Sequence, residues 1–328
     1  MRTRYTKVLQ FLLFLVVGTA ILFWLYRDQD PQELLTAIKY DVNYWWILAS
    51  LFAGLMSNIS RTIRWQMLIT PLGGKKPGFI NTFLALSIGY IANLAIPRMG
   101  EVSRCAILSK HENLSFTQLI GTVVAERALD IISMLTYLLL AIILQFGILN
   151  SMTGSSFDFT KLYSSFTTPI PYIILLFLAI TLWLFRNKIR NSRAFYKIKG
   201  LWKKFRQGFL SFRNVDNKPW FIGHTILVFI FYFLMMYLNF FAFDYTHHLS
   251  PLAALTVFVF GTLGMIAPVQ GGIGPWHFMV ITSLTAYGIS STDAGIFALV
   301  VHGALNIMII LLGLLSLLAL PFVNKKRK

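Results

Sequence analysis

The sequence predicts an all-α membrane protein whose helices cross the bilayer several times. Of its 328 residues, 56% are hydrophobic and only 12% are charged, whereas soluble domains carry about 25% charged residues. The apolar residues gather in long stretches, and an apolar helix of about 20 residues crosses the hydrocarbon core. Arginine and lysine outnumber the acidic residues 29 to 12. That excess is typical of cytoplasmic membrane loops, so we expect no nucleic acid as a partner.

Six stretches are apolar and long enough to span the membrane once each. They lie at about 8–26, 44–63, 119–146, 169–186, 219–243 and 294–320. The first follows a basic N-terminus, as a signal peptide does, but it ends in Phe-Trp-Leu-Tyr rather than in a small-residue cleavage site. We therefore interpret it as a retained anchor.

Two further apolar regions, 79–112 and 251–288, are each interrupted near the middle by proline and glycine. Suppose that each of the six uninterrupted stretches crosses the membrane once. The basic loops and both termini then all lie in the cytoplasm only if each interrupted region begins and ends on the same side of the membrane. Each region is then a hairpin, either re-entrant or fully crossing. The two hairpins enter the membrane from opposite sides.

The two interruptions resemble each other in sequence. "IPRMGEV" (96–102) and "APVQGGI" (267–273) share the pattern P-x-x-G. Broken segments at corresponding positions of two halves are typical of transporters built from inverted repeats. We therefore predict one membrane domain over 1–328, with halves at about 1–168 and 169–328.

The linker 186–218 holds 11 of the 29 basic residues and a single acidic one. Large apolar side chains recur in it at steps of three and four: Phe195, Ile198, Trp202, Phe205, Phe209 and Phe212. This pattern predicts an amphipathic helix at the cytoplasmic membrane surface. A basic loop with incidental aromatic residues is the alternative.

The first interruption carries charges. Pro97 cannot donate a backbone hydrogen bond, and broken backbone at membrane depth survives only beside protein or a water-filled cavity. Gly100 frees the chain from helical dihedral angles. We therefore predict that Arg98, Glu101 and Arg104 face an internal polar cavity; solvation at the cytoplasmic surface is the alternative.

A second charged group, Glu126, Arg127 and Asp130, lies near the start of an apolar stretch. Each ionisable group in a membrane helix costs roughly 2.5–3.5 kcal/mol, so this group needs partners. Together with the three charges of the first interruption it forms a neutral set of three positive and three negative charges. The set is interpreted either as a structural ion-pair cluster or as a route for a polar substrate.

The second interruption is rich in glycine instead. Gly271, Gly272 and Gly274 lie between Pro268 and Pro275. Glycine lets backbone amides approach a ligand, and a helix start presents free N–H groups to an anion. A tight packing turn is the alternative. The sequence contains no histidine pair with metal-ligand spacing, no nucleotide-binding loop and no dinucleotide motif, so we predict neither a metal nor a cofactor.

Four segments resemble a known family. "RTIRWQMLITPLG", "GYIANLAIPRMGEVSRCAIL", "VVAERALDIISML" and "PVQGGIGPWHF" resemble the lysylphosphatidylglycerol synthase transmembrane-region family, the flippase-like membrane domain of the multiple peptide resistance factor. The resemblance covers nearly the whole chain. Family members with synthase activity carry a cytosolic aminoacyltransferase domain, which this sequence lacks, so we expect a transporter-type protein rather than an enzyme.

The resemblance implies a flippase or scramblase of the bacterial or archaeal cell membrane, with cytoplasmic termini and a phospholipid or other amphiphilic lipid as substrate. The headgroup, expected to carry an anionic phosphate, would bind at the positions that match the family motifs: Arg98, Gly100, Glu101, Arg104, Glu126, Arg127, Asp130, Gly271, Gly272 and Gly274. Arg61, Arg64 and Trp65 match a further motif, and we expect them to be interfacial contacts, with substrate contact as the alternative.

Two other functions stay open. The chain is alternatively a non-catalytic partner of a separate lipid synthase or glycosyltransferase. A lipid-modifying transferase, with Glu101 or Asp130 as its base, is the third interpretation. The missing nucleotide-binding features argue against the transferase.

Overall fold

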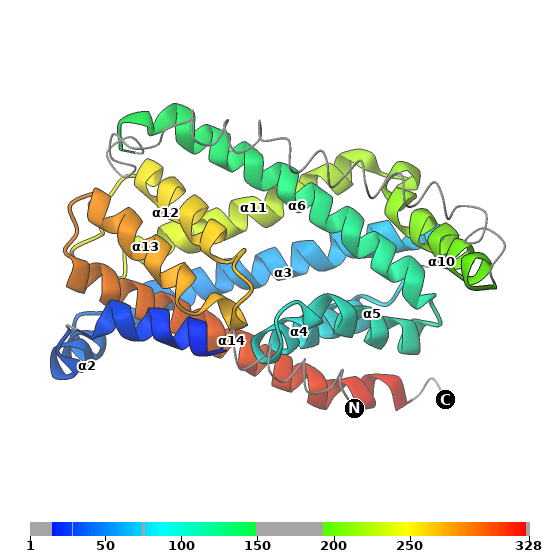
Figure 1. Ribbon diagram of the computed structural model, residues 1–328, viewed down its shortest axis with the longest axis horizontal. Coiled ribbons are helices and arrows are strands. Elements are labelled where there is room, and N and C mark those ends of the chain that lie inside the picture. The colour runs from blue at the N-terminus through cyan, green and yellow to red at the C-terminus, as the bar shows by residue number, and fades with distance from the viewer. Residues whose placement is uncertain (1–14, 28, 74–75, 149–192, 326–328) are drawn as a thin grey trace.

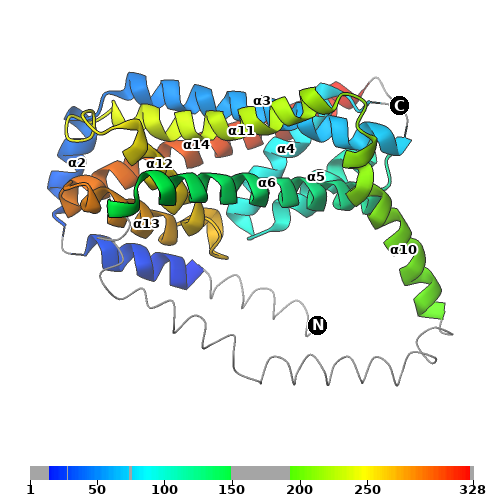
Figure 2. The ribbon, with the colours of Figure 1, turned by 90° about the horizontal axis from the view of Figure 1, so that it is seen from above.

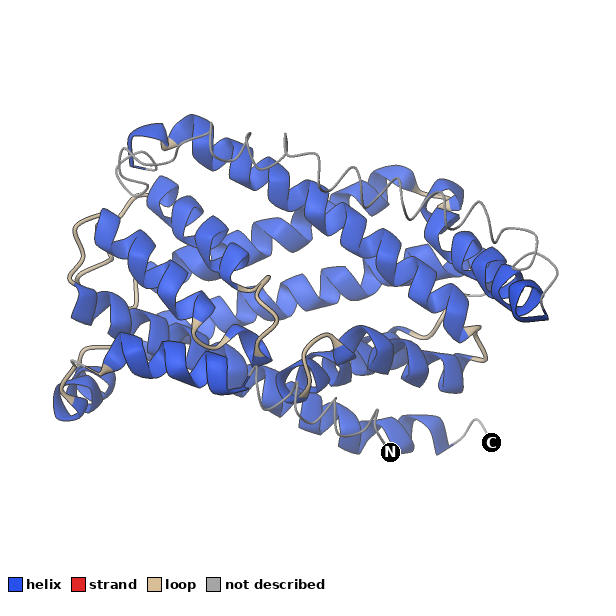
Figure 3. Ribbon diagram, in the orientation of Figure 1, coloured by secondary structure: helices blue, strands red, loops and turns tan. Residues whose placement is uncertain are grey.

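The computed structural model describes residues 15–27, 29–73, 76–148 and 193–325. Every regular element in these ranges is a helix (Figure 1 and Figure 3). The helices are Leu15–Tyr26, α2 (Pro31–Tyr40), α3 (Tyr44–Gly73), α4 (Phe79–Ala95), α5 (Met99–Glu112), α6 (Phe116–Leu144), α10 (Arg193–Phe209), α11 (Lys218–Phe240), α12 (Pro251–Gly264), α13 (Pro275–Ala286) and α14 (Ser291–Asn324), with the 3-10 turns η2 (Leu210–Asn214) and η3 (Gln270–Gly272).

Helices α6, α11 and α14 are long and apolar enough to cross a membrane. Their outward faces suit lipid rather than water: on α6, Ile131, Leu135 and Leu139 are each more than half exposed. The prediction of an all-helical, multi-pass membrane protein is confirmed at this level. The expected span 169–186 lies outside the described residues.

Helix α3 is longer than predicted. The sequence predicts a span over 44–63, whereas the helix continues unbroken to Gly73 and has 30 residues. Polar residues such as Arg64 and Gln66 end the apolar run in the sequence. Both side chains are buried in the protein, where Arg64 pairs with Asp130 and Gln66 donates a hydrogen bond to the carbonyl oxygen of Pro77. With these partners the helix continues through the polar stretch.

Both interrupted regions fold into two helices joined by a break, as the Pro/Gly interruptions predict; their return to one side of the membrane stays a prediction. The first hairpin is α4–α5 and the second is α12–α13. The four helices have 17, 14, 14 and 12 residues. At 1.5 Å per residue they are about 18–26 Å long, shorter than a hydrocarbon core of about 30 Å. Their length therefore favours the re-entrant alternative.

The two hairpins lie toward opposite ends of the molecule, with their breaks near its middle (Figure 1 and Figure 3). The breaks meet each other: a Cβ atom placed on Gly271 of the second would lie 2.7 Å from Leu94 Cδ2 of the first. The two breaks thus lie against each other, although both also carry exposed residues: Ile96 and Met99 in the first, and Met265 and Ile266 in the second.

Helices α3 and α11 pack side by side and antiparallel. Ser57 Oγ donates a hydrogen bond to the carbonyl oxygen of Val228 (3.0 Å), and Ser60 Oγ lies 2.7 Å from His224 Nδ1. In Figure 1, α6 and α14 also run in opposite directions. The chain therefore repeats the order long helix, broken hairpin, long helix, and the second set runs opposite to the first.

Helix α10 leaves one end of the bundle at a steep angle to the long helices (Figure 2). It is the helix expected in the basic linker, and η2 follows it directly. Trp202 is 61% exposed and Phe212 is 37% exposed, as expected of a helix with an apolar surface stripe. The side chains of Phe195 and Ile198 lie outside the described ones.

Candidate functional site

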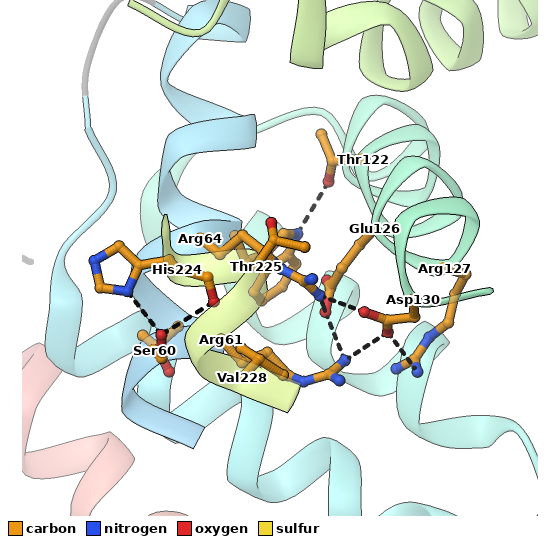
Figure 4. A network of polar contacts seen from close by, with 12 residues as sticks. Ser60, Arg61, Arg64, Thr122, Glu126, Arg127, Asp130, His224, Thr225 and Val228 are labelled. Carbon is orange, nitrogen blue, oxygen red and sulfur yellow. Dashed lines mark hydrogen bonds and ion pairs between the residues drawn. The ribbon is translucent and has the colours of Figure 1, made fainter. Parts of the chain in front are cut away.

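Helices α3 and α6 bring two pairs of charged residues together inside the bundle. Arg61 and Arg64 lie about one turn apart on α3, and Glu126 and Asp130 lie about one turn apart on α6. Figure 4 shows these four side chains pointing toward one another. The i, i+3 and i, i+4 spacings thus present two arginines to two carboxylates.

Each arginine bridges both carboxylates. Arg61 Nη1 lies 2.8 Å from Glu126 Oε1 and 3.0 Å from Asp130 Oδ2. Arg64 Nη2 lies 3.2 Å from Glu126 Oε1 and 2.7 Å from Asp130 Oδ1. The side chains of Arg64 and Glu126 are fully buried. Charges this deep are stable only when they are paired and hydrogen-bonded, and this arrangement supplies both conditions.

Helix α5 contributes a third arginine. Arg104 Nη2 lies 2.9 Å from Glu126 Oε2, so both oxygens of this carboxylate have arginine partners. The guanidinium carbon of Arg104 lies 4.5 Å from the ring centroid of Trp65, a cation–π contact. Trp65 Nε1 in turn donates a hydrogen bond to Thr122 Oγ1 (3.0 Å). Glu126 therefore joins α3, α5 and α6 at a single side chain.

A more open pair completes the arrangement. Arg127 Nη2 lies 3.4 Å from Glu101 Oε1, and Arg127 Nη1 lies 3.2 Å from Asp130 Oδ2. The side chain of Arg127 is 42% exposed and that of Glu101 is 28% exposed. These two residues form the accessible edge of what we call the charged cluster: Arg61, Arg64, Glu101, Arg104, Glu126, Arg127 and Asp130.

The charged cluster is not neutral. Its four guanidinium groups face three carboxylates, which leaves an excess of one positive charge. Several buried guanidinium nitrogens also have no hydrogen-bond partner among the described residues: Arg61 Nε, Arg64 Nε and Nη1, Arg104 Nε and Nη1, and Arg127 Nε. A buried donor without a partner costs about 1–3 kcal/mol. The cluster thus offers both charge and directed N–H groups to an anion.

A small polar pocket borders the cluster. Tyr90 and Asn93 of α4 line it together with Glu101, Arg104 and Arg127. Its volume of about 10 Å³ holds about one water molecule. In this arrangement of the helices the pocket is therefore closed to a lipid headgroup.

A larger, mostly apolar cavity of about 290 Å³ also borders Tyr90. It lies between the hairpins: Tyr90 comes from the first, and Met265 and Trp276 come from the second. Tyr232 of α11 lines it as well, and the ring of Tyr232 lies 5.7 Å from the guanidinium carbon of Arg61. Polar and apolar spaces thus adjoin at Tyr90.

The structure brings together five of the residues expected at the first interruption and its partner stretch: Glu101, Arg104, Glu126, Arg127 and Asp130. Gly100 lies beside them, where its backbone N–H donates a hydrogen bond to Asn93 Oδ1 (2.6 Å). A Cβ atom on Gly100 would overlap the carbonyl oxygen of Gly89, so glycine permits the close packing of α4 and α5.

Arg61, Arg64 and Trp65 are not at an interface. Their exposed fractions are 4%, 0% and 0%, and the two arginines are central members of the charged cluster. An interfacial anchor needs a side chain that reaches the headgroup region. The expectation of interfacial contacts is therefore wrong.

Arg98 does not join the cluster. Its side chain is exposed and makes no ion pair with any residue that the structure describes. Helix α5 begins only at Met99, and Arg98 has a φ of +63°. It therefore lies outside the helical register that directs Glu101 and Arg104 toward α6. The expected neutral set of six charges is corrected accordingly.

The second interruption forms a tight turn away from the charged cluster. Gly271, Gly272 and Gly274 have φ values of +59°, +74° and +93°, which favour glycine. His302 Nε2 donates a hydrogen bond to the carbonyl oxygen of Gly271 (2.9 Å), and its ring stacks on Trp276 at 4.7 Å. These contacts fit the packing-turn alternative, and an anion contact at these glycines stays a prediction.

Sequence reasoning missed Tyr90, Asn93 and Thr122, which support the site from α4 and α6. Nothing in their local pattern distinguishes them from other polar residues of membrane helices. The spacing of the arginines on α3 could have indicated the site. R-x-x-R places two positive charges on one face of α3, and E-x-x-x-D places two negative charges on one face of α6, so the two faces can pair.

Residues 10–313 match the sequence profile of the family described as lysylphosphatidylglycerol synthase TM region. The match covers most of the chain and includes every residue of the charged cluster. No curated protein and no solved structure matches the chain significantly.

Proposed function

Because the chain belongs to the lysylphosphatidylglycerol synthase TM region family, we propose that it is a lipid translocase. It moves a phospholipid or another amphiphilic lipid between the two leaflets of a membrane. The observation that carries this proposal is the charged cluster, with its excess positive charge and its buried guanidinium N–H groups that have no partner among the described residues.

In the proposed architecture, residues 1–328 form one domain with six full spans and two re-entrant hairpins. Its halves, about 1–168 and 169–328, are inverted repeats. The antiparallel packing of α3 on α11 and the opposite entry of the two hairpins support this proposal. Binding sites of such transporters lie where the broken segments of the two halves meet.

The charges at the two ends of the bundle support a cytoplasmic location for both termini in the cell membrane. The end that holds the loops before α3, after α11 and before α14 carries mainly acidic residues: Asp30, Glu33, Asp41, Asp244 and Asp293. The opposite end carries mainly basic residues: Lys76, Lys110, Lys203, Lys204, Arg206, Arg213, Lys218 and Lys325. Cytoplasmic loops accumulate lysine and arginine.

The headgroup phosphate binds at the charged cluster. Guanidinium groups bind phosphate oxygens in a bidentate manner, and such charge-assisted hydrogen bonds are roughly twice as strong as neutral ones. Arg127, at the exposed edge, meets the headgroup first, and Arg104 holds it through Nε and Nη1. Exposed Arg98, at the tip of the first hairpin, attracts the anion electrostatically.

The polar pocket must open for this to happen, since it holds about one water. Movement of the first hairpin away from α6 separates Glu101 from Arg127, whose 3.4 Å pair is partly exposed. It also separates Arg104 from Glu126, whose 2.9 Å pair is buried, and thereby frees Arg104 for the headgroup. The apolar cavity beyond Tyr90 accepts the apolar part of the lipid next to its headgroup.

The experiment is lipid movement in reconstituted vesicles. A headgroup-labelled anionic phospholipid is followed between leaflets without nucleotide, because the sequence has no nucleotide-binding loop. The test variant is Arg104→Lys, which keeps the charge beside Glu126 and removes the donors Nε and Nη1. We expect about a tenfold slower movement, since one charge-assisted hydrogen bond contributes about 1.5–3 kcal/mol.

Lys218→Gln is the matched control, because Lys218 is exposed at the start of α11, outside the charged cluster. Movement equal to that in protein-free vesicles, across several headgroups, refutes the translocase proposal. If a strain that lacks the chain then loses the activity of a separate lipid synthase or glycosyltransferase, the chain is an accessory partner of that enzyme.

A further inference from the structure

A groove of about 590 Å³ lies between α10 and α6, apart from the charged cluster. Its apolar wall is formed by Val124 of α6 and by Trp202, Phe205 and Phe209 of α10, and Arg206 and Arg213 also line it. We call it the aromatic groove. Val124 and Glu126 are two residues apart, about 200° around the helix axis, so the groove and the charged cluster lie on nearly opposite faces of α6.

The groove is fixed by close packing of the two helices. A Cβ atom on Gly208 of α10 would overlap the carbonyl oxygen of Gln118, and one on Gly121 of α6 would overlap the carbonyl oxygen of Phe205. Gln118 Nε2 also donates a hydrogen bond to Gln207 Oε1 (3.2 Å). Backbone contact at two glycines holds α10 in one position against α6, so the groove is a built feature.

Its apolar wall is a continuous row of aromatic rings. The ring centroids of Trp202 and Phe205 are 5.3 Å apart, and those of Phe205 and Phe209 are 6.4 Å apart. Trp202 is 61% exposed. An exposed aromatic row at the end of a membrane bundle fits the acyl chains of a lipid, because tryptophan favours the membrane interface.

Its charge is positive and uncompensated. Neither Arg206 nor Arg213 makes an ion pair with any acidic residue that the structure describes, and α10 contains no acidic residue. Both arginines are exposed. Juxtamembrane arginines bind anionic lipid headgroups. The ligand that matches this groove has an acyl chain and an anionic headgroup.

We propose that the aromatic groove is a second lipid site, occupied by a membrane lipid with an anionic headgroup. The headgroup lies between Arg206 and Arg213, and one acyl chain lies along Trp202, Phe205 and Phe209. The site is independent of the transported lipid, and its test needs no transport activity.

The test uses Trp202 as its probe. The full chain is reconstituted in vesicles that contain brominated phosphatidylglycerol or brominated phosphatidylcholine at equal mole fraction. Bromine quenches the fluorescence of nearby tryptophans. The part of this quenching that is lost in the Trp202→Phe variant is the quenching of Trp202 itself. We expect Trp202 to prefer the anionic lipid about tenfold, because each arginine near the surface adds to its attraction.

Two double variants separate a defined site from general surface charge. Arg206→Gln with Arg213→Gln should abolish the preference, whereas Lys203→Gln with Lys204→Gln, exposed on the same helix and not lining the groove, should retain it. Circular dichroism confirms that the variants fold. An equal effect of the two double variants overturns the proposal, as does a Trp202 that neither lipid quenches. Inorganic phosphate should not reduce the preference; if it does, the groove binds a free anion and the lipid occupant is wrong.

Discussion

The two broken hairpins are built alike and carry different chemistry. Each is closed by a glycine: a Cβ atom on Gly100 would overlap the carbonyl oxygen of Gly89, and one on Gly264 would lie 2.8 Å from the carbonyl oxygen of Pro275. The first hairpin carries three charged residues at its break, whereas 251–288 contains no Asp, Glu, Lys or Arg.

This difference shows that different residues determine the shape of a hairpin and the charge at its break. Close backbone approach demands glycine, and both hairpins meet that demand, at Gly100 and at Gly264. The positive φ angles fall on glycines in the second hairpin and on Arg98 in the first. The first hairpin places two charged side chains, Glu101 and Arg104, against charged residues of α6. The second hairpin fixes its turn with neutral groups, His302 and Trp276. The charged cluster therefore belongs to one half of the molecule.

The largest expected effect tests the charged side of this comparison. Glu126→Gln leaves Arg61, Arg64 and Arg104 without a carboxylate that all three share. Removing one partner of a buried ion pair costs about 3–5 kcal/mol. We expect a loss of that size in the free energy of unfolding, measured by titration with sodium dodecyl sulfate.

Glu101→Gln is the matched control for Glu126→Gln. Its carboxylate is 28% exposed and has one ion pair of 3.4 Å, and such a pair contributes about 1 kcal/mol or less. Equal losses for the two variants would show that burial in the cluster does not decide the effect.

The effect of intermediate size tests whether the two hairpins are closed in the same way by a glycine. Gly100→Ala and Gly264→Ala each force a methyl group against backbone, and overpacking of this kind costs about 1–3 kcal/mol. We expect similar losses in the free energy of unfolding for both. On α11, Gly223 has no atom within 4 Å of a built Cβ, so Gly223→Ala should leave stability unchanged or raise it by up to about 1 kcal/mol. A loss for Gly100→Ala alone would mean that the two hairpins do not close alike.

The smallest expected effect concerns the neutral turn of the second hairpin. His302→Phe keeps an aromatic ring beside Trp276 and removes the hydrogen bond to the carbonyl oxygen of Gly271. The loss of one hydrogen bond lowers stability by about 0.5–1.5 kcal/mol. His302→Gln keeps a donor and should lose less. If His302→Gln is the less stable of the two variants in thermal unfolding, ring stacking rather than the hydrogen bond holds the turn.

Much of the fold follows from the sequence because membrane helices show their pattern locally. Apolar length located α6, α11 and α14, and the Pro/Gly interruptions located both hairpins. The end of α3 was missed because Arg64 and Gln66 look like a loop until their buried partners are known. A helix can continue through polar residues when the partners are supplied from elsewhere in the chain.

The charged cluster was only partly predictable, for a similar reason. The charges at 98–104 and 126–130 form a neutral set, which by charge alone needs no residue of α3. The packing of α3 against α6 adds Arg61 and Arg64, and the left-handed conformation of Arg98 removes that residue. Neither change is visible in local sequence, because one depends on helix packing and the other on a single backbone angle.

The bridge between α3 and α6 has a consequence for biosynthesis. Arg61 and Arg64 precede Glu126 by 65 and 62 residues, so at 5–20 residues per second their carboxylate is made roughly 3–13 s later. During that interval the two arginines lack their partners, and an arginine inside the bilayer costs roughly 2.5–3.5 kcal/mol. We therefore expect α3 to enter the bilayer together with α6 rather than before it. In a coupled translation and insertion assay, nascent chains that end at residue 115 should insert α3 poorly, and chains that end at residue 148 should insert it well; efficient insertion of both would show that α3 enters the membrane alone.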